Sequence, residues 1–459
     1  MKCCEEISWW EPVIPMLDQA PEHHYPQDLA ALVVERWGKV EVPPVQPGAK
    51  RIRLQQPLPE PPMLEYLLST CYHASLMREE QRPVKFRVLV CTPHSLPSEQ
   101  GPPRSLHRMV FRDPKRFDPY TLMRIAPAAD YSRSLIGVTL DGHRKPVIWG
   151  IIQSGSRWLY SMTGGRGAPP PLPACLQILV SGPGRVEVHK GSAFIGKLAD
   201  GQVSGETINV FNAAWLRARF APIRARLLEL HNGARAQAGS SWAVLDEKVI
   251  SMVAQHAAKR LISVVKNSQH GGTLILLPQD IADEVVRKNR YISMKYRFID
   301  EEPRRRFSSL LLRMMNALAA SCVHTCDGRV TQDDYSHSNS ETIADLDESI
   351  FEVAYQVASM AAVDGAVVLA NGMEVVGFGG EISGDLPDVP LVAKACDTEG
   401  KERMMESTES VGTRHRSVYR LCNALHEAMG IVISQDGGVR FIRWSEGMVT
   451  YWNHEAVTP

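Results

Sequence analysis

Three side chains that can bind an anion stand side by side near the C-terminal end of the sequence. The stretch GTRHR, residues 412–416, places one arginine on each side of a histidine. Such neighbouring cationic groups repel one another unless something anionic lies among them. Two interpretations stay open at this point: a site for phosphate oxygens, or an arginine pair that forms salt bridges with nearby carboxylates such as Glu406 and Glu409.

The residues after this stretch predict a helix that begins at GTRHR. Apolar side chains recur there at helical spacing and predict one buried face: Val418, Leu421, Cys422, Leu425 and Met429. Gly430 then ends the helix, and IVIS begins a strand. The first N–H groups of a helix lack internal partners and carry the positive end of its dipole. The pattern therefore favours a site for several phosphate oxygens, such as those of a triphosphate.

A second motif, DGA at residues 364–366, lies where a predicted helix meets a buried strand. Glycine lets a ligand approach the backbone closely. An aspartate at such a junction can hold a divalent cation or orient a hydroxyl group. Because Asp-Gly is also an ordinary turn signal, DGA by itself leaves both interpretations open.

Together, these two motifs resemble those of the diadenylate cyclase (DAC) domain, a family that joins two ATP molecules into cyclic di-AMP. DGA and GTRHR are both unbroken and stand in the order of the family, with a glycine-bearing strand pair between them and IVIS and DGGVRFI after them. The resemblance covers residues 242–459, a little under half of the chain, with an apparent insertion at 304–346.

The resemblance implies roles for individual residues. Asp364 would bind the catalytic metal, Mg²⁺ or Mn²⁺, and help to orient the attacking 3′-hydroxyl. Gln435 replaces a carboxylate that is common in the family, which leaves Asp436 as the candidate second metal anchor. With Asp364, the implied catalytic residues are Arg414, His415 and Arg416. The implied nucleotide-binding residues are Gly365, Ala366, Phe378, Gly379, Ile382, Gly412, Thr413 and Ser434.

The resemblance also implies an assembly. Cyclic di-AMP is symmetric, so two ATP-loaded domains must face each other, and we expect a homodimer or larger homo-oligomer that is inert as a monomer. Two other functions remain open: a catalytically silent module that binds ATP or a cyclic dinucleotide, and a scaffold with a decayed site. The altered SQD sequence (434–436) favours the silent module, whereas the intact Asp364 and RHR triplet favour the enzyme.

The rest of the chain divides by pattern into three parts. Residues 1–60 are rich in Pro and Trp and predict an extended lead-in. Residues 61–241 carry strand-like runs and a helical connector, and predict an α+β sensor or regulatory domain for an unknown ligand. Residues 242–459 alternate helices and apolar strands and predict an α/β domain, a mixed sheet flanked by helices.

Local signals refine this division. Asp141-Gly142 and Asn371-Gly372 each predict a hairpin turn. A helix is expected over 211–231 with an interruption at Pro222, followed by a linker at 232–241 and, later, a mobile polar loop at 325–342.

Composition limits the classes of partner. Lys+Arg and Asp+Glu number 51 each, so the chain has no global field that would hold a nucleic acid or an anionic membrane. No run of 18 apolar residues predicts a membrane span. The nine cysteines form no regular framework, and the first residues lack a continuous apolar core. We therefore expect a cytoplasmic protein with free thiols.

Overall fold

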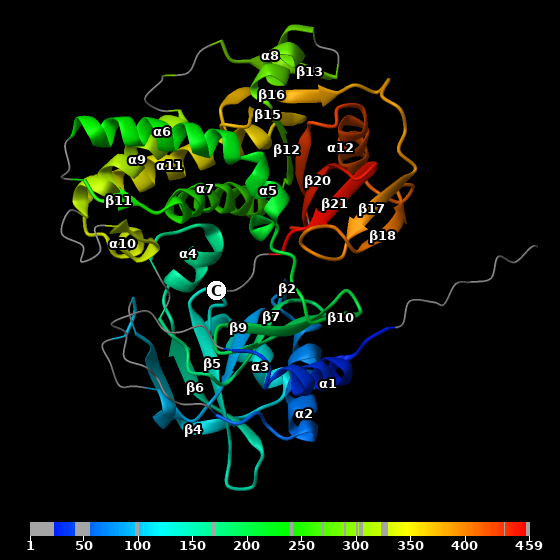
Figure 1. The fold of residues 1–459 in the computed structure, drawn as a ribbon. Coiled ribbons are helices and arrows are strands. Elements are labelled where there is room, and N and C mark those ends of the chain that lie inside the picture. The colour runs from blue at the N-terminus through cyan, green and yellow to red at the C-terminus, as the bar shows by residue number, and fades with distance from the viewer. Residues whose placement is uncertain are drawn as a thin grey trace, which may run out of the picture.

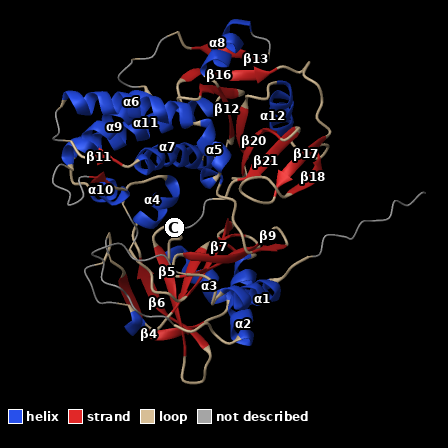
Figure 2. Ribbon diagram, in the orientation of Figure 1, coloured by secondary structure: helices blue, strands red, loops and turns tan. Residues whose placement is uncertain are grey.

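The computed structural model describes residues 23–41, 56–96, 101–103, 105–167, 170–238, 242–268, 270–288, 291–299, 302, 306–322, 329–435 and 437–455. Within these residues the chain forms two α/β halves, the N-terminal one below the C-terminal one in Figure 1, each built on a mixed sheet (Figure 2). The predicted fold class, a mixed sheet flanked by helices after an α+β half, is confirmed.

Eight of the described strands form the N-terminal sheet. In chain order they are β3 (Phe86–Val90), β4 (His107–Arg116), β5 (Ser134–Leu140), β6 (Pro146–Gln153), β7 (Leu176–Gly182), β8 (Arg185–Lys190), β9 (Ala193–Ala199) and β10 (Gln202–Ser204). The sheet order is β10-β9-β8-β7-β3-β5-β6-β4, with β3 and β5 parallel. A small separate sheet pairs β1 (Arg78–Glu79) with β2 (Arg82–Pro83). The turn predicted at Asp141-Gly142 connects β5 and β6.

Helices pack on both faces of this sheet. One face is covered by α1 (Pro26–Arg36), α2 (Pro61–Ser75) and α3 (Pro119–Ile125), and the short α4 (Arg157–Thr163) lies toward the C-terminal half (Figure 1). The 3₁₀ turn η1 (Pro93–Ser95) lies between β3 and β4, and η2 (Ala126–Ala128) lies between α3 and β5. The prediction of an extended lead-in is wrong for α1, because Leu29 and Val33 are fully buried against the N-terminal core.

The connector between the halves contains η3 (Val210–Asn212), α5 (Ala214–Arg219) and α6 (Ala221–Gln237). The interruption predicted at Pro222 is present, since α5 ends just before it and Pro222 occupies the first turn of α6, where its missing N–H costs no hydrogen bond. The predicted linker at 232–241 is helical as far as Gln237, and residues 239–241 lie outside the described residues.

Nine of the described strands form the C-terminal sheet, in the order β13-β16-β15-β12-β19-β20-β21-β17-β18. Their bounds are β12 (Gly272–Leu277), β13 (Ile292–Arg297), β15 (Ala366–Ala370), β16 (Val375–Ile382), β17 (Leu391–Ala395), β18 (Arg403–Ser407), β19 (Met429–Ile433), β20 (Val439–Ser445) and β21 (Met448–Asn453). β12 pairs in parallel with β15, and β17 with β21. The hairpin predicted at Asn371-Gly372 joins β15 to β16.

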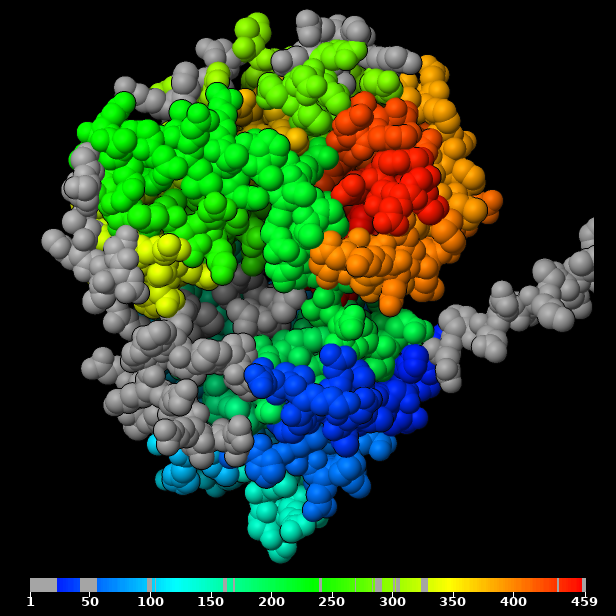
Figure 3. All heavy atoms as spheres, viewed as in Figure 1, coloured from blue at the N-terminus to red at the C-terminus, as the bar shows by residue number. Residues whose placement is uncertain are grey.

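Helices cover both faces of the C-terminal sheet. One face carries α7 (Glu247–Asn267) and α11 (Glu341–Ala361), and the other carries α8 (Gln279–Lys288) and α12 (Thr413–Ala424). Beyond α7, a second helical layer contains α6 and α9 (Phe307–Ser321), with α10 (Gln332–His337) and the strand pair β11 (Val244–Leu245) and β14 (Arg329–Val330). In Figure 3 this green layer abuts the orange and red surface of the last strands.

The prediction of a polar loop at 325–342 is partly wrong. Residues 323–328 lie outside the described residues, but β14, α10 and the first turn of α11 fall within the range. Tyr335 of α10 is fully buried, and its hydroxyl donates a 2.6 Å hydrogen bond to Asp347 Oδ1. One buried tyrosine therefore fixes a segment whose composition otherwise resembles a loop.

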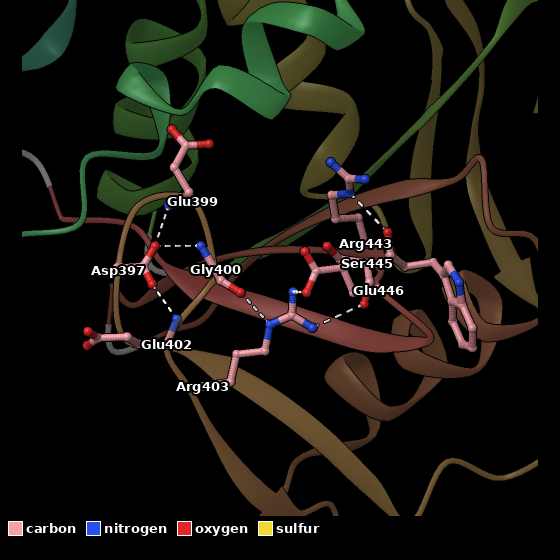
Figure 4. A network of polar contacts seen from close by, with 9 residues as sticks. Asp397, Glu399, Gly400, Glu402, Arg403, Arg443, Ser445 and Glu446 are labelled. Carbon is pink, nitrogen blue, oxygen red and sulfur yellow. Dashed lines mark hydrogen bonds and ion pairs between the residues drawn. The ribbon is translucent and has the colours of Figure 1, made fainter.

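A polar network organises the turn between β17 and β18 (Figure 4). Asp397, in the turn between β17 and β18, accepts hydrogen bonds from three backbone N–H groups of its own turn, those of Glu399, Gly400 and Glu402. Burial would raise the pKa of Asp397, but these donors outweigh it and lower that pKa. Glu399 Oε1 in turn accepts a 2.8 Å hydrogen bond from the first N–H group of α5, that of Ala214. The turn thereby stabilises the start of that helix.

Acid should weaken the fold through His454, which follows β21. Its Nδ1 accepts a 3.3 Å hydrogen bond from Val210 N, and its ring lies between Phe211 and Phe441. Burial, with Lys259 and Lys266 nearby, lowers the pKa of His454 to about 3. As the pH falls, His454 is therefore protonated in the unfolded chain before it is protonated in the folded one. Its full contribution to the free energy of unfolding is present above pH ~6.5 and is lost as the pH falls toward the pKa of the folded state.

We expect acidification from pH 7 to 5 to lower the free energy of unfolding by about 2 kcal/mol through this histidine. Urea unfolding at several pH values would measure it. His454→Asn should make the free energy of unfolding depend less on pH. His23 is exposed, so His23→Asn should keep the pH dependence of the unchanged protein. Equal pH dependence in both variants would contradict the assignment to His454.

Candidate functional site

The DGA motif is placed by a turn between α11 and β15 that requires glycine. Gly365 has φ +114°, and a Cβ atom there would lie 2.6 Å from the carbonyl carbon of Gly379. No other residue type fits this backbone-on-backbone contact without strain. The contact leaves Asp364 exposed, with no hydrogen bond or ion pair to any residue that the structure describes, while Ala366 is buried at the start of β15.

The strand register brings Asp364 and Ser434 to one end of the sheet. Thr273 of β12 pairs with Ala366 on one side and with Val432 on the other. Adjacent strands are about 4.8 Å apart, so these two partners are roughly 10 Å apart. Asp364 precedes Ala366, and Ser434 follows Val432 on an antiparallel strand, so both residues extend past the same sheet end.

Helix α12 begins at this same end. Its N-cap is Gly412, and GTRHR forms its first turn, as the sequence predicted. A Cβ atom on Gly271, just before β12, would lie 2.6 Å from Arg414 Nη1, so this guanidinium lies directly against the end of the sheet. The predicted helix is too long, because α12 ends at Ala424 and Met429 begins β19 instead.

The two arginines at the start of α12 have no counterion among the described residues. Arg414 and Arg416 are exposed and form no ion pair there. Of the two carboxylates that could have paired with them, Glu406 contacts Lys394 at 3.6 Å and accepts a hydrogen bond from Tyr451, and Glu409 forms no ion pair among the described residues. Two unpaired guanidinium groups at a helix N-terminus favour an anion, and the salt-bridge interpretation finds no support in this geometry.

His415 is half-buried and lines a pocket beside the helix start. The other lining residues are Glu406, Ser407, Ser410, Val411, Gly412 and Arg440. Arg440, from β20, was missed by the sequence reasoning, although it lies in the DGGVRFI stretch that carries the resemblance. Its Nη1 donates to Tyr419 Oη at 3.2 Å, and its guanidinium lies 4.5 Å from the ring centroid of Tyr451. The pocket thus adds a third arginine to the site.

The predicted nucleotide wall on β16 does not form one continuous surface. Gly379 has φ +64°, and the pairing of β15 with β16 shifts register at this point. Phe378 packs in the cluster on the α7 and α11 side, whereas Ile382 packs on the α12 side. Phe378 also stacks on Tyr296 of β13, with ring centroids 4.7 Å apart, a contact that the sequence reasoning missed.

The donor set fits one mode of metal binding. Among the described residues no group of three His, Cys, Asp or Glu side chains could hold a metal, and Asp436 lies outside them. Mg²⁺ usually takes one or two carboxylates and completes its shell with water and substrate phosphates. The unpaired Asp364 carboxylate fits such a shared ion, and Ser434, whose Oγ donates to Gly438 O at 3.1 Å, lies at the same sheet end.

Comparison with known families matches residues 53–153 to the family described as "Probable sensor domain DACNV". The matched segment contains α2, β3, β4 and β5 of the N-terminal half. No curated protein and no solved structure matches the chain. None of the described helices combines the length and apolar character needed to cross a membrane.

Proposed function

We propose that this chain is a diadenylate cyclase that condenses two ATP molecules into cyclic di-AMP and two pyrophosphates under control of its N-terminal half. The observation that supports the proposal is that Asp364 and Arg414 lie at one sheet end, with Arg416 in the same first turn of α12, all exposed and without an ion pair among the described residues. The match of residues 53–153 to a DAC-associated sensor family supports it from the other half.

The side chains at this end suit the demands of phosphoryl transfer. Attack of a 3′-hydroxyl on an α-phosphorus needs in-line positioning and neutralisation of charge more than a special nucleophile. Thr413, Arg414 and Arg416 would hold phosphate oxygens, and His415 and Arg440 would extend this grip into the adjacent pocket. Asp364 would hold Mg²⁺ or Mn²⁺, which supplies further positive charge at the phosphates when bound.

The exposure of these residues supports an assembly of facing copies. Asp364, Arg414 and Arg416 all lie at the surface of a single chain. Each copy would bind one ATP, and both new bonds of the symmetric product would form where two sites face each other. The proposed active species is therefore a homodimer or a larger homo-oligomer.

Helix α4 offers a route for control by the sensor half. On one side, Trp158 of α4 lies over the buried Arg87 of the N-terminal sheet, 3.7 Å from guanidinium carbon to ring centroid. On the other side, Gly164 packs on α7, so closely that a Cβ atom there would lie 2.0 Å from His256 O. A change on the sensor sheet would thus reach, through α4, a helix that covers the C-terminal sheet.

A second candidate function is a silent module that binds ATP or a cyclic dinucleotide. Gln435 favours it, because this exposed residue follows β19 where the resembled family commonly has a carboxylate. An assay with ATP and Mg²⁺ or Mn²⁺, followed by chromatography for cyclic di-AMP and pyrophosphate, separates the two. Product supports the cyclase, whereas ATP binding with no product under either metal supports the silent module.

Arg414→Ala should weaken ATP binding by about 10- to 100-fold, the usual loss for one charge-assisted hydrogen bond to phosphate. Equilibrium binding of ATP would measure it. Arg420→Ala is the matched control, because Arg420 lies on the same helix but pairs with Asp388. An unchanged affinity in Arg414→Ala, or an equal loss in Arg420→Ala, would count against a phosphate grip at the helix start.

A further inference from the structure

A second pocket lies at the opposite end of β15, and residues of α5, α6, α7, α9 and the turn between β15 and β16 line it. Its cavity volume is about 130 Å³, similar to that of an engineered cavity that holds one benzene ring, so a larger ligand would extend into the open mouth. Most of its lining is apolar: Phe211, Leu216, Phe220, Ile223, Leu227, Ile250, Ala254, Ala258, Phe307, Leu311 and Met373. A ligand here would therefore bury an apolar body between helices.

The few polar groups of this pocket specify the rest of the ligand. Asn371 Oδ1 is buried and has no hydrogen-bond partner among the described residues, which is costly unless a bound donor satisfies it. Gln255 does not supply that donor, because its Nε2 donates to Phe211 O at 3.2 Å. The pocket thus presents one unsatisfied acceptor within an apolar wall.

Two arginines add positive charge to the same lining. Arg217 and Arg224 both line the pocket, and the guanidinium of Arg224 reaches no closer than 3.5 Å to a protein acceptor, Arg217 O. No described lining residue is acidic, and neither arginine forms an ion pair within the described part of the chain. Two arginines in one pocket lining, without a counterion among the described residues, favour an anionic ligand group.

We propose that this pocket binds an amphipathic organic anion: an apolar body between the helices, a hydrogen-bond donor to Asn371 and an anionic group at Arg217 and Arg224. The site is distinct from the one at Asp364. Asn371 follows β15 and Asp364 precedes it, so the two residues are roughly 20 Å apart along the strand. The proposal is therefore independent of the proposed cyclase activity, and binding alone tests it.

Two probes that share one body can test each part of this assignment on the full chain. 1-Anilinonaphthalene-8-sulfonate has an aromatic body, an N–H donor and an anionic group, and N-phenyl-1-naphthylamine has the same body and donor without the charge. Fluorescence titration of the unchanged protein should show tighter binding of the sulfonate by about tenfold, the worth of one charged contact. Equal affinities for the two probes would overturn the assignment of an anion.

Variants locate the binding. Arg224→Gln should remove the preference for the sulfonate and leave the neutral probe unchanged, whereas Arg226→Gln, exposed on the same helix outside the pocket, should change neither. Ala254→Phe should fill the cavity and weaken both probes at least tenfold. Unchanged sulfonate binding in Arg224→Gln, or unchanged binding of both probes in folded Ala254→Phe, would overturn the proposal. Should Ala254→Phe not fold, the sulfonate affinities of Arg224→Gln and Arg226→Gln test the proposal, and equal affinities would overturn it.

Discussion

Asp364→Asn is expected to reduce the formation of cyclic di-AMP by on the order of 10³-fold or more, because a single carboxylate would hold the metal. The change is nearly isosteric and removes a charge that no described residue pairs with, so the fold should survive it. Product formation from ATP would be followed by chromatography at saturating Mg²⁺ and, separately, Mn²⁺. Circular dichroism and the thermal midpoint should match those of the unchanged protein.

A matched control separates this effect from a general loss of surface charge. Asp345 is an exposed aspartate on α11, the helix that leads into the DGA turn, and its carboxylate forms no ion pair with a described residue. Asp345→Asn should retain full activity. Retention of full activity in Asp364→Asn would remove that residue from the proposed chemistry, even if the chain proved to be a cyclase.

Gly365→Ala is expected to lower the free energy of unfolding by about 3 kcal/mol, from strain at positive φ combined with overpacking. At φ +114° an alanine is strained, and its Cβ would lie 2.9 Å from both Gly379 Cα and Gly380 N. Those neighbours are backbone atoms of a paired strand and cannot rotate away as a side chain could. Urea unfolding, monitored by tryptophan fluorescence, would measure the loss.

Gly412→Ala provides the comparison within the same site. A Cβ atom on Gly412 would meet no heavy atom within 4 Å, and its φ of −60° suits any residue. Its stability should therefore change by about 0.5 kcal/mol or less. If the two alanine variants unfolded at the same urea concentration, the close contact between Gly365 and Gly379 could not be what positions Asp364.

Local signals in the sequence predicted much of the C-terminal half because they act over a few residues. The Asn371-Gly372 turn and the start of α12 depend on backbone preferences of the residues themselves. The end of α12 was harder to place, since Met429 satisfies the helical period and yet pairs with Arg443 in the sheet. Periodicity records which side chains are buried, and a strand can bury the same residue equally well.

Other features depend on partners far away in the chain. The bulge at Gly379 separates Phe378 from Ile382, although alternation would place both on one face of a regular strand. The buried face of α1 contacts strands more than a hundred residues later, such as β9. Arg440 and His415 line one pocket because α12 packs against β20. Such contacts follow from topology, which a single sequence does not display.

The anchoring of the connector has a mechanical consequence. Residues 208–215, which lead from one sheet to the other, are tied to the C-terminal half by three backbone N–H and carbonyl contacts, to His454, Glu399 and Glu455. The connector is therefore held against the C-terminal half and does not act as a flexible linker there. Under the proposed control by the N-terminal half, a displacement there would be transmitted through packed helices and not through a loose connection.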